Sequence, residues 1–278
     1  MRVKSLLEKF IRRKKFPPEG LDFFKLISRH EDACEARTAS ILPRLGKLAP
    51  LCFENLGTVL SLLDRAASCF WGCRRGDHVV EYLVGRVCTS SYAARRLFQF
   101  GYYDESLSIT RSIGEISNLL WLFNLDASTF EKWRRAPDSE RRHRFSPVRV
   151  RFRLEEICRE KSPDLKLLMI QQDRYGALSA LATHVTPETR PQAHNPLRRP
   201  LAGSVFQEAG AVVALQELAG ATGRAALALP KLLGYDERRT GEFRDAGAHL
   251  ISSIGRLSVL NIDECFAEMR ESRKRSDT

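Results

Sequence analysis

The apolar residues of this chain recur at steps of three and four, and this spacing limits what the chain can fold into. The clearest example lies within residues 104–125. Its apolar stripe consists of Ile109, Ile113, Ile116, Leu120 and Phe123. Such a stripe predicts an amphipathic helix, because about 3.6 residues make one helical turn. The sequence shows no sustained alternation of apolar and polar residues and no Asn-Gly hairpin signal, so strands are not expected.

The same spacing predicts several further helices. They are expected at residues 21–41, 51–70, 79–100, 147–158, 163–183, 205–233 and 239–269. Together they predict an all-α fold, an irregular multi-helix bundle of seven to nine helices with no significant sheet. In this interpretation residues 1–18 form a basic amphipathic N-terminal helix, and residues 19–278 form a single helical-bundle domain.

Two segments of that domain are not expected to be regular. Residues 126–147 form a charged connector, of which residues 126–145 are expected to be irregular. Residues 185–203 contain four prolines, Pro187, Pro191, Pro196 and Pro200. Proline has no backbone N–H and a fixed φ, so this loop can be neither an interior helix nor a central strand. A loop of this length inside a compact domain is often functional.

The net charge of +11 is concentrated in two short segments. Residues 1–15 hold seven basic residues and one acidic residue, and residues 134–153 hold eight and two. The rest of the chain is close to neutral, so an acidic partner is expected at these segments. Contact of residues 1–15 with a membrane surface is disfavoured, because one short amphipathic helix binds lipid weakly and no lipidation signal accompanies it.

The second basic segment is the candidate contact for RNA or another polyanion. Its candidate residues are Arg134, Arg135, Arg141, Arg142 and Arg144. Aromatic residues lie among them, and guanidinium groups beside aromatic rings suit phosphate contact and base stacking. The competing interpretation is a solvated, charged surface that binds nothing.

The cysteines and histidines give no sign of a cofactor or a metal. Seven cysteines are present without a Cys-x-x-Cys pair, so neither a disulfide framework nor a zinc site is expected. Cys69 and Cys73 are interpreted as two small buried residues on one helix face. The lone Glu-x-x-His, Glu140 to His143, lies among arginines that repel a cation. No long apolar run suggests a transmembrane helix, and the reduced cysteines indicate a cytoplasmic protein.

Three short motifs carry a resemblance to a known family. They are Arg111-Ser112-Ile113-Gly114-Glu115, the run Tyr175 to Ser179, and Thr183-His184-Val185-Thr186-Pro187. Their order resembles an uncharacterised family of bacterial all-helical proteins that is classed as a domain of unknown function. The resemblance covers residues 91–214. It implies an all-helical bundle, and no activity comes with it.

The resemblance draws attention to Arg111 and Glu115, which are four residues apart and can pair along one helix face. Three interpretations are open: a solvated face with an exposed ion pair, a structural ion pair between helices, and the wall of a binding site. In the third, Tyr175, His184 and His194 join Arg111 in a pocket suited to an anion. His184 also has a simpler explanation, because the dipole at a helix C-terminus stabilises a charged histidine.

Such bundles are also distantly similar to HEPN proteins, many of which cut RNA with an Arg, four to six intervening residues and a His. Arg244 and His249 match that spacing. The similarity implies His249 as general acid/base and Arg244 as the group that stabilises the charged transition state. The competing interpretation is a surface arginine and a histidine packed against a neighbouring helix. On an α-helix the two side chains point about 140° apart.

Two functions are therefore compared. The first is a non-enzymatic cytosolic bundle that binds an anionic partner, either a nucleic acid or a phosphorylated ligand. The second is a HEPN-like, metal-independent ribonuclease that uses Arg244 and His249. The sequence leaves open whether the protein is an enzyme and whether it forms a homo-oligomer.

Overall fold

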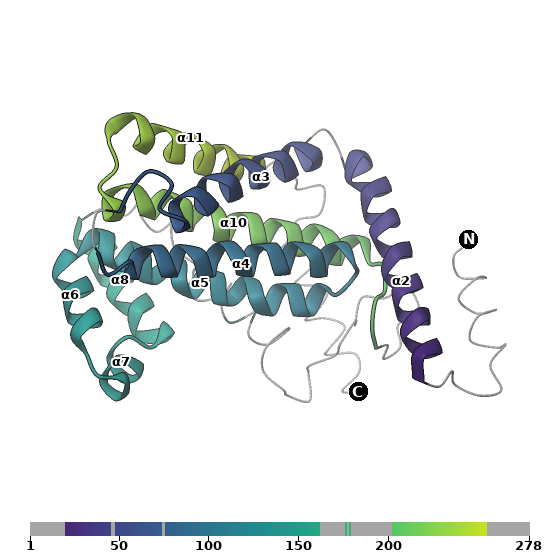
Figure 1. Ribbon diagram of the computed structural model, residues 1–278, viewed down its shortest axis with the longest axis horizontal. Coiled ribbons are helices and arrows are strands. Elements are labelled where there is room, and N and C mark those ends of the chain that lie inside the picture. Colours follow the sequence, from purple (N-terminus) through teal and green to yellow (C-terminus); the bar gives the residue numbers. More distant parts are fainter. Residues whose placement is uncertain are drawn as a thin grey trace.

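Two long helices, α5 (Tyr103–Leu125) and α10 (Glu208–Leu233), lie against each other at the centre of the bundle (Figure 1). The structure is a computed structural model. It describes residues 20–45, 48–73, 76–161, 176, 178 and 202–254. Within these residues the regular elements are nine α-helices and one short 3₁₀ helix, with no strand. The predicted all-α bundle is therefore confirmed.

The other helices surround this central pair. They are α2 (Gly20–Ile41), η1 (Leu42–Leu45), α3 (Leu48–Ala67), α4 (Val79–Gln99), α6 (Ala127–Arg135), α7 (Asp138–Arg144), α8 (Pro147–Lys161) and α11 (Glu237–Ile254). Helices α4 and α8 pack on α5, whereas α11 packs on α10 and α3. Helix α2 stands at the opposite end from α6 to α8 (Figure 1). None of the described helices is long and apolar enough to cross a membrane.

Helix α5 is covered on nearly every side because α4, α8 and α10 all pack against it. Leu120 and Phe123 of the predicted stripe are buried, and so is the polar residue Asn118. Polar side chains also join α5 to α10. Trp121 donates its ring N–H to the carbonyl oxygen of Arg224 at 2.9 Å, and the amide of Asn124 donates to the backbone of α10 at the same distance.

Small residues let α11 approach α10 closely. A Cβ added at Gly247 of α11 would lie 2.9 Å from the side chain of Leu227, and one at Gly223 of α10 would lie 3.0 Å from Ile251. Such distances leave no room for a larger side chain, so the Ala- and Gly-rich composition of α10 serves helix packing. Gly234 ends the helix in the left-handed region, with φ of 65°.

The charged connector differs from its prediction. Residues 126–145 are not irregular, because most of them form two short helices, α6 and α7, which lead into α8. The side chain of Asp126 accepts the backbone N–H of Ser128, which satisfies a free donor at the start of α6. Pro137 stands immediately before α7, where its missing N–H costs nothing. Dense charge therefore did not prevent helix formation, since a residue that favours a helix start precedes each helix.

The end of α3 also differs from its prediction. Helix α3 ends at Ala67 and not at the predicted residue 70. Cys69 and Cys73 therefore lie in the loop, with Cys69 partly covered and Cys73 exposed. The prediction that both are buried on one helix face is wrong. The N-terminal helix at 1–18, the helix expected at 163–183, the loop at 185–203 and the end of the last predicted helix lie almost wholly outside the described residues.

Candidate functional site

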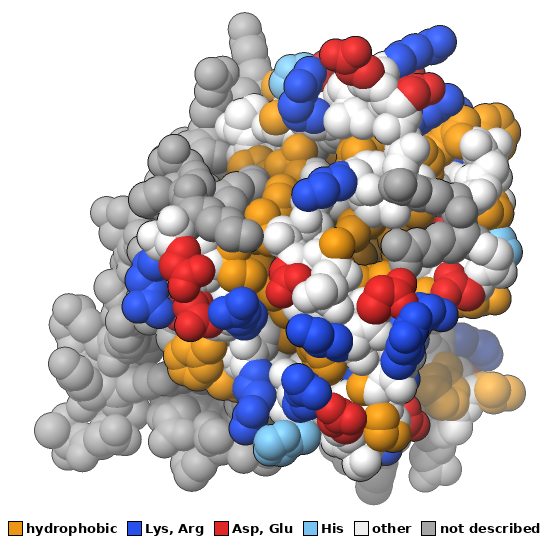
Figure 2. All heavy atoms as spheres, turned by 90° about the vertical axis from the view of Figure 1, so that its left-hand side faces the viewer, with side chains coloured by type: hydrophobic (Ala, Val, Ile, Leu, Met, Phe, Trp, Pro, Cys, Tyr) orange, Lys and Arg blue, Asp and Glu red, His pale blue; other side chains and the backbone are white. Residues whose placement is uncertain are grey.

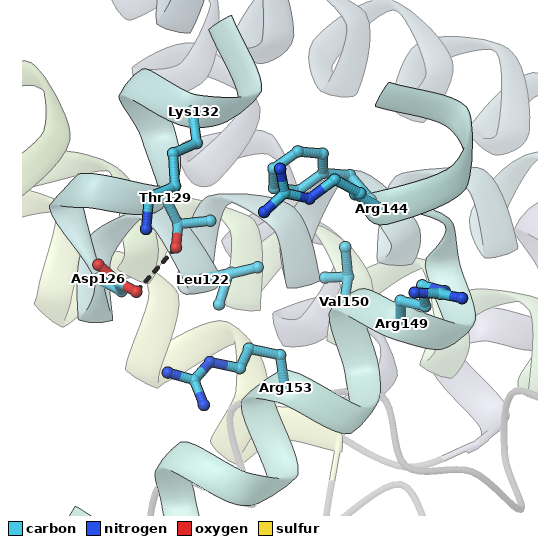
Figure 3. A pocket seen from close by; sticks show the side chains of 9 residues that line it. Leu122, Asp126, Thr129, Lys132, Arg144, Arg149, Val150 and Arg153 are labelled. Atoms are coloured by element: carbon cyan, nitrogen blue, oxygen red, sulfur yellow. Dashed lines mark hydrogen bonds between the residues drawn. The ribbon is translucent and has the colours of Figure 1, made fainter. Parts of the chain in front are cut away.

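A pocket of about 210 Å³ lies where the end of α5 meets α6, α7 and α8 (Figure 3). It is lined by Leu122, Asp126, Thr129, Lys132, Arg144, Phe145, Arg149, Val150 and Arg153. Four of these nine residues are cationic at neutral pH and one is a carboxylate. The pocket therefore carries an excess of positive charge, and it suits an anion.

The local helices explain how the four cations come together. Lys132 belongs to α6, Arg144 ends α7, and Arg149 and Arg153 are four residues apart on α8 and so share one face. In Figure 3, Lys132 and Arg153 extend from opposite sides toward the space beside Asp126, whereas the guanidinium of Arg149 points away from it. Arg149 instead approaches the His143 ring at 3.3 Å, at the rim of the pocket.

Asp126 is the one carboxylate of the pocket, and its hydrogen bonds hold it ionised. It accepts the hydroxyls of Ser128 at 2.7 Å and of Thr129 at 2.8 Å, as well as the backbone N–H of Ser128. These donors favour the charged form and lower the pKa of Asp126 below its ordinary value. Asp126 thus offsets part of the positive charge at neutral pH.

Two of the arginines also form ion pairs on their own helices. Arg144 contacts Glu140 and Arg153 contacts Glu156, each at 2.5 Å. Lys132 makes no ion pair with any residue that the structure describes. Exposed ion pairs stabilise a protein by only about 0.2 to 1 kcal/mol each, because water and salt screen them. A phosphate can therefore compete for both guanidinium groups.

An exposed aromatic ring lies on α8, the helix that also supplies Arg149 and Arg153 to the pocket. Phe152 lies one residue before Arg153 on α8, and 60% of its surface is exposed. The guanidinium of Arg151 lies 5.6 Å from the centre of the Phe152 ring. A large apolar side chain left in water gains by stacking against a planar ligand, and nucleic acid bases are such ligands.

Of the five arginines predicted to contact nucleic acid, only Arg144 lines the pocket. Arg134 pairs with Glu131 at 2.9 Å and with Asp77 at 3.2 Å. Arg141 donates to the carbonyl oxygens of Trp133 and Ala136, so it joins α6 to α7. These two arginines hold the local structure.

The other two predicted arginines, Arg135 and Arg142, are exposed and lie outside the pocket. Figure 2, which faces this end of the molecule, shows Lys and Arg side chains interspersed with Asp and Glu. The surface at this end is therefore not one unbroken basic patch, but within the pocket lining the cations outnumber the carboxylates four to one.

Lys132, Arg149 and Arg153 were missed as site residues. Arg149 and Arg153 belong to the basic run and lie within the helix predicted at 147–158, but their spacing of four was not interpreted as a shared helix face. Because α8 begins at Pro147, as predicted, this spacing of four puts both arginines on one face. Proline is favoured at the first position of a helix, so the sequence did contain the signal.

Arg111 and Glu115 form an ion pair at 3.1 Å on α5. Their side chains are only 16% and 25% exposed, so the interpretation as a solvated face is wrong. They share a face of α5 with Leu122, but Arg111 lies about 16 Å away along the helix axis. Tyr175, His184 and His194 lie outside the described residues. Their convergence on Arg111 stays a prediction.

Arg244 and His249 both lie at the surface of α11. Arg244 is 72% exposed and approaches Asp245 at 3.5 Å. His249 is exposed as well, so the interpretation as a histidine packed against a neighbouring helix is wrong. The backbone carbonyl of His249 accepts the amide of Asn55 on α3 at 3.4 Å. The role of these two residues in RNA cleavage stays a prediction.

No family model matches this chain, and neither a curated protein nor a solved structure matches it.

Proposed function

We propose that the protein binds a single-stranded nucleic acid and holds a backbone phosphate in the basic pocket. The observation that carries this proposal is the meeting of four cations from three helices around one cavity with a single carboxylate. Its volume of about 210 Å³ is below the roughly 300 to 1,000 Å³ of sites that enclose a whole small molecule. A phosphate group that belongs to a longer chain fits this size.

The exposed ring of Phe152 favours a nucleic acid over a simple phosphate. Stacking of one base on an aromatic side chain contributes about 1 to 3 kcal/mol, and it is independent of sequence. The exposed Arg135 and Arg142 on the neighbouring helices can contact further phosphates along the strand. The proposed activity is binding, with no chemical step.

Charge reversal in the pocket tests this proposal. Lys132→Glu with Arg149→Glu breaks no ion pair with a described residue. We expect this double variant to bind a fluorescent single-stranded RNA at least about 30-fold more weakly than wild type at about 0.1 M salt. The control is Lys25→Glu with Arg238→Glu, which changes the net charge equally on α2 and α11. Equal weakening by both would show that overall charge, and not the pocket, attracts the RNA.

Phe152→Ala separates a nucleic acid from a small phosphorylated ligand. Loss of stacking should weaken RNA binding by about 5-fold or more. Competition by inorganic phosphate for the pocket should be unchanged, because phosphate has no ring to stack. If Phe152→Ala leaves RNA binding unchanged, no base stacks on this ring, and the argument for a nucleic acid over a smaller phosphorylated ligand is lost.

The ribonuclease alternative is supported by the exposure of Arg244 and His249, which leaves both accessible to a strand. Incubation with labelled tRNA and total RNA in EDTA tests it. Cleavage by wild type that His249→Ala abolishes would establish the ribonuclease. If neither protein cuts RNA, the alternative loses its motif.

A further inference from the structure

The loop between α3 and α4 contains two residues with an unusual backbone. Cys69 has φ of 54° and His78 has φ of 51°, and no other non-glycine residue that the structure describes has a positive φ. Residues with a Cβ avoid this left-handed region because of steric repulsion. Asn, Asp and His tolerate this region better than other types with a Cβ, so Cys69 is the more unusual of the two. Such conformations cluster at functional sites, where the surroundings hold them in place.

The same two residues take part in a cluster of metal-ligating side chains. The ligand atoms of Cys69, Cys73, His78 and Glu81 all lie within 4.8 Å of one another. The Sγ of Cys69 is 3.3 Å from Nδ1 of His78. A tetrahedral zinc site with metal–ligand distances of about 2.0 to 2.3 Å has edges of about 3.3 to 3.8 Å. The four groups are therefore close to the spacing that such a site requires.

The chemistry of the four groups points to zinc. Thiolate sulfur and imidazole nitrogen are the ligands that zinc prefers, and a carboxylate oxygen often completes the set. Glu81 is only 5% exposed. A buried carboxylate is costly unless a cation or hydrogen bonds compensate its charge, and a bound metal ion supplies that compensation.

We propose that Cys69, Cys73, His78 and Glu81 bind one zinc ion in a closed, structural site. Four protein ligands fill the tetrahedral shell, so no position is left for a reacting water. The site is separate from the basic pocket, and the proposal does not depend on nucleic acid binding.

The neighbours of the loop show what the zinc ion would hold in place. Trp71, between the two cysteines, packs its ring against Tyr235 at 5.6 Å and Phe243 at 6.0 Å, at the corner between α10 and α11. Asp77, just before His78, pairs with Arg134 of α6 at 3.2 Å. A metal ion that fixes both ends of this loop would therefore join three parts of the bundle.

Metal titration of the reduced protein tests this inference. Zn²⁺ is added in competition with a chromophoric chelator, and Co²⁺ is added in a parallel experiment. We expect one Zn²⁺ per chain, and a Co²⁺ spectrum with the intense bands of tetrahedral coordination and a thiolate charge-transfer band. Cys73→Ser and His78→Ala should each weaken Zn²⁺ binding at least about 100-fold. Cys34→Ser and His249→Ala, which alter the same residue types elsewhere, should bind as wild type does.

Three results would overturn the inference. The first is wild-type protein that takes up less than one tightly bound Zn²⁺ after full reduction. The second is an octahedral Co²⁺ spectrum without the thiolate band. The third is unchanged affinity in Cys73→Ser and His78→Ala. Circular dichroism of the metal-free variants checks that they fold, and the Co²⁺ spectrum of wild type decides the matter even where a variant does not.

Discussion

The basic pocket and the cysteine–histidine cluster lie at the same end of the bundle, linked by the ion pair between Arg134 and Asp77. They are built in opposite ways. The pocket gathers cations from a stretch whose excess charge is visible in the sequence. The cluster gathers four ligands whose meeting depends on two left-handed residues. An excess of charge can be read from composition. The four ligands, in contrast, come together only because two non-glycine residues have a positive φ, and composition does not reveal the sign of φ.

The largest expected contrast between the two regions concerns stability. A ligand at about 1,000 times its Kd stabilises the folded state by about 4 kcal/mol, which raises the Tm of a domain this size by about 8 to 16 °C. We expect EDTA to lower the Tm of the zinc-loaded protein by that amount. Charge reversal at Lys132 and Arg149, which are exposed, should change Tm by less than about 2 °C. Differential scanning calorimetry measures both, and equal shifts would remove the distinction between a structural and a binding region.

An intermediate effect on stability is expected at Asp126. Its carboxylate caps α6, and its negative charge repels an anion bound in the pocket. Asp126→Ala should cost about 1 kcal/mol of stability, whereas Asp126→Asn should cost little because Asn caps equally well. Both variants lose the carboxylate, so both should bind RNA about 3-fold to 10-fold more tightly. Chemical denaturation and RNA titration measure the two effects. Unchanged RNA affinity in Asp126→Asn would place the bound anion away from this carboxylate.

The pH dependence of the stabilisation by Asp126 follows from the direction in which folding shifts its pKa. Because the folded state lowers the pKa of Asp126, its stabilisation is present above the ordinary carboxyl pKa. The stabilisation is lost as the pH falls through the lowered value. Wild type and Asp126→Ala should therefore differ least in acid, and a difference between these two proteins that grows on acidification would contradict the assignment.

The smallest effect is expected at the link between the regions. Arg134 and Asp77 are both about one third exposed. A double-mutant cycle with Asp77→Ala and Arg134→Ala should give a coupling free energy of about 0.2 to 1 kcal/mol. Asp77→Ala should change zinc and RNA affinity by less than about 3-fold, because neither site includes Asp77. A larger change in either affinity would mean that the two regions act as one site.

The sequence predicted the long helices well because their apolar residues are regularly spaced. Helix α4 agrees with its prediction to within one residue at its end, and α10 begins three residues later than expected. The short helices α6 and α7 were missed, since charge-rich segments of only nine and seven residues show no sustained apolar period. Their cap at Asp126 and the proline before α7 were the usable signals.

The candidate sites were less predictable, for physical reasons. Arg144 was identified, but the roles of Arg134 and Arg141 depend on acids and carbonyl groups that only the fold brings near them. The metal-ligating cluster was missed because a Cys-x-x-x-Cys pair suggests one helix face. That inference is wrong because helix α3 ends at Ala67, before Cys69.

The salt dependence of RNA binding tests phosphate contact in the pocket most directly. Lys132→Gln removes one cation that points into the pocket and has no ion pair with a described residue. Each phosphate contact to a single strand contributes about 0.7 to the slope of log affinity against log salt concentration. We expect Lys132→Gln to lower the magnitude of that slope by about 0.7 relative to wild type. A slope identical to that of wild type would contradict phosphate binding in the pocket.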